Sequence, residues 1–319
     1  MRRALPWVLA GLVAAILIAG VIFYVVVVRP WVAMPDEPRD RIEARFAKVE
    51  ALAELPEHCR ADNSMIIEAI DELQSSKADI YGIVWPRDEK GRAPEVVQSR
   101  DPASLPAEMK RAIDNLLEWD RNNGGFGHEP CDDSIAPIKA LNLGELALAT
   151  ADAGREEPRL RAILHLARDL RTCGSLIEGR VGFTLARRVA EWGKDRGAPS
   201  TDAFHRFRPH AEEVLPLLAR EAVCSVRLAE GAYGSSDGET YSAREVLMLE
   251  QYYANLLEQA SKTPTDLAKI SEAIDHEAPD ELPPSLLVRA MTLTLSSVVE
   301  STAEDIDAYD SFLKASRAE

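Results

Sequence analysis

The chain has 319 residues, with 37 Lys and Arg against 53 Asp and Glu, and a formal net charge of −16 at pH 7. This acidic balance excludes a general nucleic-acid-binding protein, because such a surface repels phosphate backbones. The part that follows the N-terminal apolar segment is long enough for one large domain or two small ones with a proper hydrophobic core.

The chain begins with a charged tip and a long apolar segment. Residues Ala4–Val28 contain no charged side chain, and a helix of this length crosses the hydrocarbon core of a bilayer. A cleavable signal peptide has a shorter apolar core and a small-x-small cleavage site, so the sequence predicts an uncleaved signal anchor. Because Arg2 and Arg3 favour a cytoplasmic N-terminus, residues 1–30 are predicted to anchor the protein in a bacterial inner membrane, with the remainder in the periplasm.

Small residues lie on one face of this predicted span. Gly11, Ala15 and Ala19 are four residues apart, a spacing that lets two membrane helices approach closely. The sequence therefore predicts two partners for this segment, the lipid bilayer and a second copy of the chain in a homodimer.

The rest of the chain has apolar residues at helical spacing almost throughout, whereas strand-like alternation is scarce. The predicted fold class is all-α: an irregular bundle of antiparallel helical hairpins, with solenoid-like stacking as an alternative. We expect an N-terminal helical segment over residues 31–106 and a main helical domain over 107–319. The predicted helices span 38–54, 63–76, 105–121, 134–153, 156–172, 175–193, 209–230, 242–261, 265–276 and 284–315.

Two local features refine this prediction. Ser175 with Glu178 fits a capping box, in which a hydroxyl and a carboxylate bond to each other's backbone amides at a helix start. Residues 78–106 interrupt the helical pattern and are predicted to form a long loop. Within it, residues Ile80–Trp85 and Glu95–Gln98 are predicted to form a small hairpin.

The segment "DRNNGGFGHEPCDDS", Asp120 to Ser134, has the composition of a metal-binding loop. Asp120, Asn122 and the following glycines match the first half of an EF-hand loop, but Cys131 occupies the position of its bidentate acid. His128 and Asp132 complete this candidate metal set. We favour a structural interpretation, in which Asn123 and Gly124 end one helix in the left-handed conformation and Asp132, Asp133 or Ser134 caps the next.

The four cysteines also suggest structure rather than metal binding. Cys59, Cys131, Cys173 and Cys224 form an even set, as expected in an oxidising compartment. A zinc site formed by His58, Cys59, His128 and Cys131 would lack Cys-x-x-Cys spacing, so the thiols are expected to form disulfides. Four cysteines allow three connectivities, and we predict Cys59 with Cys131 and Cys173 with Cys224. No cofactor and no resident metal are expected.

Basic residues concentrate in one part of this acidic chain. Residues 155–208 contain twelve basic and seven acidic side chains. The last part of this block is a candidate patch for an anionic partner or a lipid surface. The alternative, which we favour, is that its cations pair with acidic helices and its aromatic rings belong to the core. The candidate residues are Lys194, Arg196, Phe204, His205, Arg206, Phe207 and Arg208.

Residues Leu143–Trp192, which begin "LGELALATADAG" and continue through "RLRAILHLARDL", resemble the helical part of uncharacterised membrane-anchored envelope proteins of bacteria. The resemblance covers about a sixth of the chain, and it consists of helix faces and small residues. It implies neither an activity nor a catalytic residue.

These patterns favour a membrane-anchored interaction or scaffold protein of the cell envelope, with an envelope protein as its partner. A second hypothesis is an envelope hydrolase whose acid and base come from distant positions, such as His128 with Glu129 or Asp132. A third is a purely structural anchor protein.

Overall fold

The computed structural model describes residues 37–61, 63–75, 80–86, 94, 96–126, 131, 137–151, 156–197, 201–230, 243–277 and 286–316. All regular structure in these residues is helical, and no strand occurs among them. The predicted all-α fold class is therefore confirmed for this part of the chain. The predicted span Ala4–Val28 lies outside it, and none of the described helices is long and apolar enough to cross a membrane.

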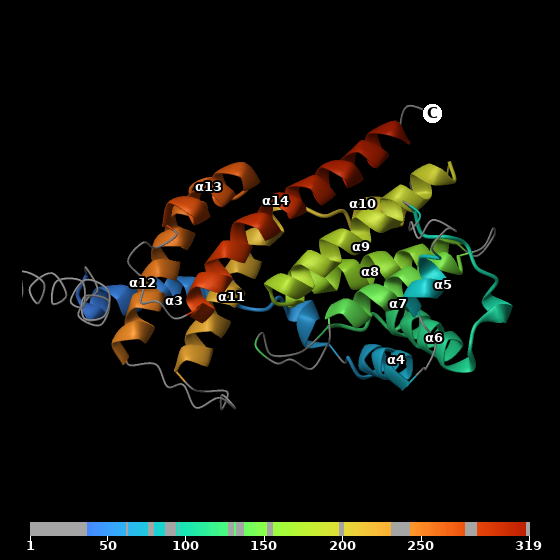
Figure 1. Cartoon of the computed structure of the whole chain (residues 1–319), viewed down its shortest axis with the longest axis horizontal. Helices are drawn as coiled ribbons and strands as arrows, with labels where there is room; N and C mark the ends of the chain where they lie inside the picture. The colour runs from blue at the N-terminus through green and yellow to red at the C-terminus, as the bar shows by residue number, and fades with distance from the viewer. Residues whose placement is uncertain are drawn as a thin grey trace, which may run out of the picture.

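The described residues form twelve α-helices and three single 3-10 turns (Figure 1). In chain order these are α3 (Arg39–Ala53), η2 (Glu57–Arg60), α4 (Ser64–Ser75), α5 (Ile80–Val84), η3 (Pro102–Ser104), α6 (Ala107–Arg121), α7 (Pro137–Ala149), α8 (Glu156–Cys173), α9 (Leu176–Asp195), α10 (Asp202–Arg206), η4 (Ala211–Glu213), α11 (Val214–Ala229), α12 (Ala243–Ala260), α13 (Leu267–Glu277) and α14 (Leu286–Ala315). Each predicted helix has a counterpart with ends a few residues from the predicted ones, although 209–230 divides into η4 and α11. The short helices α5 and α10 were not predicted.

The predicted hairpin of Ile80–Trp85 with Glu95–Gln98 is wrong, because Ile80–Val84 is the helix α5. This helix packs against α7, where the Trp85 indole Nε1 donates a 2.8 Å hydrogen bond to Oε2 of buried Glu145. The Arg188 guanidinium covers the Trp85 ring at 4.6 Å. These tertiary contacts determine the conformation of a segment whose short apolar pattern does not distinguish helix from strand.

The buried apolar side chains form two clusters, which occupy the two ends of the molecule in Figure 1. The first cluster lies among α4, α6, α7, α8 and one side of α9, and its largest members include Trp119 and Trp192. The second lies among α3, α11, α12 and α13 and includes Phe46 and Tyr253. Because α3 packs on α11 and α12 whereas α4 packs on α6, residues 31–106 contribute helices to both clusters.

Helix α14 connects the two clusters. Its Leu295 and Val299 are buried in the second cluster, and its Tyr309 and Phe312 are buried in the first. Between these pairs, buried Asp305 binds α9: Arg187 Nε lies 2.8 Å from Oδ1, and Arg180 bonds to Oδ2. One long helix therefore joins both ends of the structure (Figure 1).

Helices α8 and α9 form the central hairpin of the molecule. The connection between them ends in the predicted capping box, because the Ser175 amide donates to the Glu178 carboxylate at 2.6 Å and the Ser175 hydroxyl accepts from the Glu178 amide. Gly182 permits the close approach of the two helices, since a Cβ at this position would lie 2.5 Å from the Ala167 backbone oxygen. This packing fixes the position of α8, which carries Arg161, His165 and Arg168 of the candidate site.

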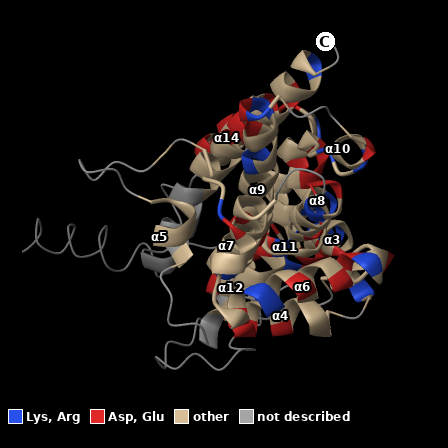
Figure 2. Ribbon diagram, turned by 90° about the vertical axis from the view of Figure 1, so that its right-hand side faces the viewer, with Lys and Arg blue, Asp and Glu red and all other residues tan. Residues whose placement is uncertain are grey.

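Charged residues are distributed over the helices of both clusters, and acidic and basic segments alternate in Figure 2. Basic segments do not gather on one side of the ribbon in this view. Local concentrations of charge come instead from side chains that converge in pockets.

Candidate functional site

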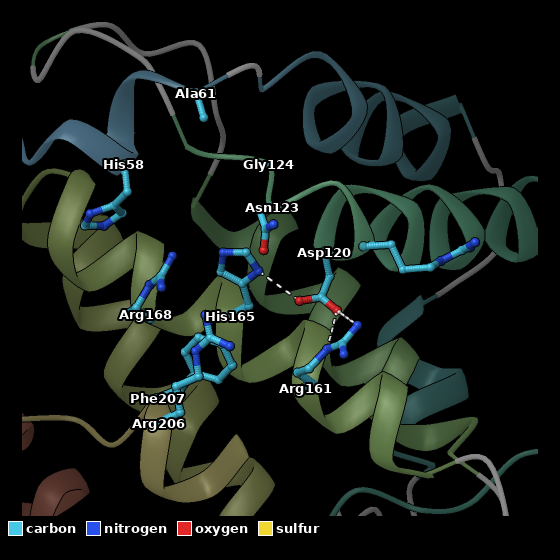
Figure 3. Close-up of a pocket in the computed structure, with 11 residues that line it drawn as sticks. His58, Ala61, Asp120, Asn123, Gly124, Arg161, His165, Arg168, Arg206 and Phe207 are labelled. Atoms are coloured by element: carbon cyan, nitrogen blue, oxygen red, sulfur yellow. Dashed lines mark hydrogen bonds and ion pairs between the residues drawn. The ribbon is translucent and has the colours of Figure 1, made fainter. Parts of the chain in front are cut away.

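A pocket of about 450 Å³ lies between η2, the C-terminal end of α6, α8 and α10 (Figure 3). Its walls are mostly polar and include four arginines and two histidines. The lining residues are His58, Ala61, Asp120, Arg121, Asn123, Gly124, Arg161, His165, Arg168, Arg206 and Phe207. We call this site the arginine pocket.

Helix α6 ends beside the arginine pocket in a turn that places Asp120 and Asn123 in the wall. Asn123 has a φ of 49°, so the predicted left-handed helix end is confirmed at this residue. Gly124 has a different role, because its amide donates to the Trp119 carbonyl at 2.9 Å and a Cβ there would lie 2.1 Å from the Trp119 ring. The glycine-rich composition of this segment is thus explained by a tight helix end.

His165 lies at the centre of the pocket and is held on three sides. Its Nδ1 is 2.9 Å from Oδ1 of Asp120. The imidazole ring stacks on Phe207, with ring centroids 5.4 Å apart and an interplanar angle of 6°, and it contacts the Trp119 ring at 4.4 Å. Only 6% of the His165 side chain is exposed. This ring is therefore a rigid part of the pocket floor.

Two arginines flank His165 on α8, one turn before it and one turn after it (Figure 3). The Arg161 guanidinium donates to Oδ2 of Asp120 at 2.7 Å, and the Arg168 guanidinium donates to Oδ1 of Asp169 at 2.8 Å. Burial alone would raise the pKa of Asp120, but the hydrogen bonds from His165 and Arg161 outweigh burial and hold that pKa below its usual value. Asp120 is therefore a carboxylate at neutral pH.

Asp169 lies behind the pocket wall, between two histidines. Its side chain is fully buried, with Oδ1 3.9 Å from Nε2 of His58 and Oδ2 3.7 Å from Nε2 of His165. Burial raises the pKa of Asp169, and the charges of His165 and Arg168 oppose that rise in part. Burial lowers the pKa of the half-exposed His58 imidazole, which the Asp169 charge opposes.

The disulfides differ from the predicted pairs. Cys59 bonds to Cys173 and Cys131 bonds to Cys224, so the predicted pairing of Cys59 with Cys131 and Cys173 with Cys224 is wrong. The Cys59–Cys173 bond joins η2 to the end of α8 and thereby fixes His58 beside Asp169. Since disulfides form in oxidising compartments, the two bonds indicate an extracytoplasmic domain.

The metal hypotheses receive no support from this geometry. Cys59 and Cys173 lie with His58 in a group whose ligand atoms are within 4.8 Å of one another, but both sulfurs are in the disulfide and offer no thiolate. The Asp120 carboxylate binds Arg161 and His165, and Asn122 is the C-cap of α6. The remaining candidates His128 and Asp132, and also Glu129, lie outside the described residues.

The predicted basic patch is divided between the core, ion pairs and the pocket. Phe204 is fully buried, and Arg208 makes two hydrogen bonds of 2.9 and 2.6 Å to Asp310 on α14. Arg196 covers the Trp192 ring at 4.7 Å. Arg206 is exposed and lines the pocket with Phe207, whereas Lys194 and His205 are exposed and do not line it.

A second cavity, of about 410 Å³, lies between the end of α3, η4 and α11. Its two arginines have a structural role. Arg171 donates to the Glu213 carboxylate at 2.7 Å and to the Phe207 carbonyl at 2.9 Å, and Arg220 donates to the Gly174 carbonyl at 2.7 Å. Both side chains are fully buried, and burial lowers the pKa of Arg220 to about 10. The arginines of the arginine pocket, by contrast, have partly or largely exposed side chains.

The arginine pocket lacks the geometry of a nucleophilic site. His58 Nε2 lies 3.0 Å from the Thr172 hydroxyl, but the same nitrogen faces Asp169 at 3.9 Å. A catalytic histidine uses one nitrogen toward the nucleophile and the other toward its orienting acid. His58 therefore does not complete a triad of this kind with Thr172 and Asp169 among the described residues of the pocket.

The pocket establishes a cationic site in an acidic chain. No protein-family model, curated protein or solved structure matches the sequence. The resemblance of Leu143–Trp192 to bacterial envelope proteins therefore stays a prediction, and functional inference depends on the site itself.

Sequence reasoning missed Arg161, His165 and Arg168 as site residues. One signal could have found them: they recur at helical spacing within the basic block 155–208, on a helix whose other positions are largely apolar. Asp120, the partner of Arg161 and His165, is 45 residues from His165 in the sequence, and only the fold shows that the two meet.

Proposed function

We propose that this chain is a binding protein of the bacterial cell envelope, and that its irregular bundle of helical hairpins holds a small anionic ligand in the arginine pocket. The observation that supports this proposal is the convergence of Arg161, Arg168, Arg206 and His58 on one cavity of a chain with net charge −16. Pockets of this volume suit small molecules.

Arg206 and His58 are the pocket groups that offer donors to a ligand. Arg206 has no carboxylate partner among the residues that the structure describes, and its exposed guanidinium lies 5.2 Å from the Phe207 ring centroid. His58 Nε2 lies 3.9 Å from Asp169, beyond hydrogen-bonding distance, and 3.0 Å from the Thr172 hydroxyl. An oxyanion placed between them would receive charge-assisted hydrogen bonds, which are about twice as strong as neutral ones.

The envelope location belongs to the same proposal. Two disulfides support an oxidising compartment, and the predicted anchor Ala4–Val28 supports attachment to the inner membrane with a cytoplasmic N-terminus. The proposed dimer contact through Gly11, Ala15 and Ala19, and a scaffold role toward an envelope protein, are compatible with a ligand pocket in the periplasmic part.

Anion binding can be measured on the full-length protein in detergent. Inorganic phosphate and citrate are the probes, and thermal unfolding in low-chloride buffer is the assay. We expect either probe to raise the melting temperature, because a ligand that binds only the folded state stabilises it by about 2.7 kcal/mol at 100 times its Kd. The double variant Arg168→Gln/Arg206→Gln should lose this shift.

The control variant is Arg111→Gln. Arg111 pairs with Glu72 at 2.8 Å on the surface and does not line the pocket, so its replacement should leave the shift unchanged. No shift with either probe, or equal shifts in all three proteins, would refute the proposed function. The compartment has its own test: alkylation of protein in intact cells should find no reactive thiol, and four free thiols would refute an extracytoplasmic domain.

A further inference from the structure

The arginine pocket has two ends that differ in charge. Arg161 and Arg168 are seven residues apart, which separates their backbones by about 10 Å along α8. His165 lies between them, and its contacts with Asp120, Trp119 and Phe207 keep the two ends apart (Figure 3).

The first end is cationic. It contains His58, Arg168 and Arg206, and in Figure 3 these three side chains lie on the same side of His165. The charge of Arg168 is shared with the buried Asp169, but Arg206 has no carboxylate partner in the described part of the chain. A ligand group placed here meets several donors and an excess of positive charge.

The second end is formed mainly by an ion pair. Arg161 Nε donates to Oδ2 of Asp120 at 2.7 Å, so this pair has little net charge to offer an anion. Arg121 also lines the pocket, but its Nε donates back along its own helix to the Leu117 carbonyl at 3.2 Å. Asn123 lies beside it, with its side chain directed toward His165 (Figure 3). Guanidinium, carboxylate and amide groups together provide both donors and acceptors.

This second end suits hydroxyl groups. A hydroxyl both donates one hydrogen bond and accepts others, and a surface with donors and acceptors satisfies both functions. An anionic group in the same position would lie next to the Asp120 carboxylate and would be repelled at close range. The pocket therefore selects for charge at one end of a ligand and for neutral polar groups at the other.

From this asymmetry we infer that the ligand is a small polyhydroxylated anion, such as a sugar phosphate or a sugar acid. Its anionic group binds at His58, Arg168 and Arg206, and its hydroxyl groups bind at Arg161, Asp120 and Asn123. The inference rests on the proposed function and specifies the chemical class of its ligand. A volume of about 450 Å³ accommodates a single sugar unit.

The test compares five probes by isothermal titration calorimetry on the full-length protein. Glucose 6-phosphate and glucuronate carry both chemical features, inorganic phosphate and hexanoate carry only the charge, and glucose carries only the hydroxyls. We expect glucose 6-phosphate or glucuronate to bind at least tenfold more tightly than the corresponding anion without hydroxyls. The stronger of the two will distinguish a phosphate ester from a carboxylate.

Two variants separate the ends of the pocket. Asn123→Gly removes the amide and retains a residue that accepts the φ of 49°, so it should reduce the advantage of the sugar ligand at least fivefold without weakening phosphate. Arg206→Gln should weaken phosphate and sugar ligand alike by at least fivefold. Arg111→Gln is again the control and should change neither affinity.

The outcomes also separate this inference from the proposed function. If phosphate and hexanoate bind as tightly as their hydroxylated counterparts, the inference is wrong and the pocket is a simple anion site. If Asn123→Gly weakens phosphate and sugar ligand equally, the assignment of the hydroxyl end is wrong. If none of the anions binds, the proposed function itself fails.

Discussion

The two disulfides allow a matched experiment on the arginine pocket. The Cys59–Cys173 bond attaches η2, and with it His58, to the end of α8, whereas neither Cys131 nor Cys224 lines the pocket. We compare the variants Cys59→Ala/Cys173→Ala and Cys131→Ala/Cys224→Ala. Both remove one cross-link, but only the first releases a residue of the pocket.

The expected stability losses are nearly equal. The bonded cysteines are separated by 114 and 93 residues, and the chain-entropy relation for loops of these lengths gives about 4.8 and about 4.7 kcal/mol for each bond taken alone. The loops overlap in sequence, so one remaining bond still restricts part of the chain released by the other. Guanidinium unfolding followed by far-UV circular dichroism should therefore show similar losses, each below these values.

The expected effects on binding are unequal. Phosphate affinity, measured by calorimetry well below the melting temperature, should fall at least fivefold in the Cys59→Ala/Cys173→Ala variant. In the Cys131→Ala/Cys224→Ala variant it should stay within twofold of the affinity of the unmodified protein. The reasoning would be refuted if both variants lost affinity equally, or if the first lost stability without losing affinity. Either result would mean that the Cys59–Cys173 bond does not position His58 for binding.

Three further predictions concern the packing around the site. Asp305→Ala leaves Arg180 and Arg187 without their buried partner, so urea unfolding should show a loss of about 3 kcal/mol in the free energy of unfolding. Glu304→Ala, on the exposed side of α14, should cost under about 1 kcal/mol, and equal losses would contradict the role of Asp305. Gly182→Ala places a Cβ against the Ala167 backbone oxygen and should destabilise the protein by about 1–3 kcal/mol. This loss should exceed that of Gly193→Ala, whose Cβ would have its nearest contact, at 3.1 Å, with the flexible Phe312 side chain. The pKa of Asp120 is lowered in the folded state, so this carboxylate stabilises the protein above its unfolded pKa of about 4, and that stability is lost as pH falls through its folded pKa. Asp120→Asn should therefore flatten the loss of stability below about pH 4, and an unchanged dependence of stability on acid pH would contradict the assignment.

Local patterns in the sequence were sufficient to predict the helices. The helix α9 and its Ser175 and Glu178 cap lie within one continuous segment, and the structure confirms both. Ile80–Val84 shows where this reasoning fails: five residues contain too little periodicity, and the Trp85 bond to Glu145 on another helix determines the outcome.

The pocket could be predicted only in part, because its residues come from distant segments. The basic block 155–208 indicated where positive charge would collect, and it contains Arg161, Arg168 and Arg206. Spacing along the chain could not show that Asp120 would neutralise Arg161 or that Cys59 would pair with Cys173. Both are long-range pairings, and sequence pattern alone carries little information about them.

The position of α14 has a consequence for how the molecule unfolds. A helix that buries Leu295 in one cluster and Tyr309 in the other cannot leave one cluster without disturbing its contacts with the other. The two ends should therefore behave as one cooperative unit, with a single calorimetric transition and shared hydrogen-exchange protection along α14. The pocket, which lies among elements that pack around the first cluster, would then be stabilised by helices that never touch the ligand.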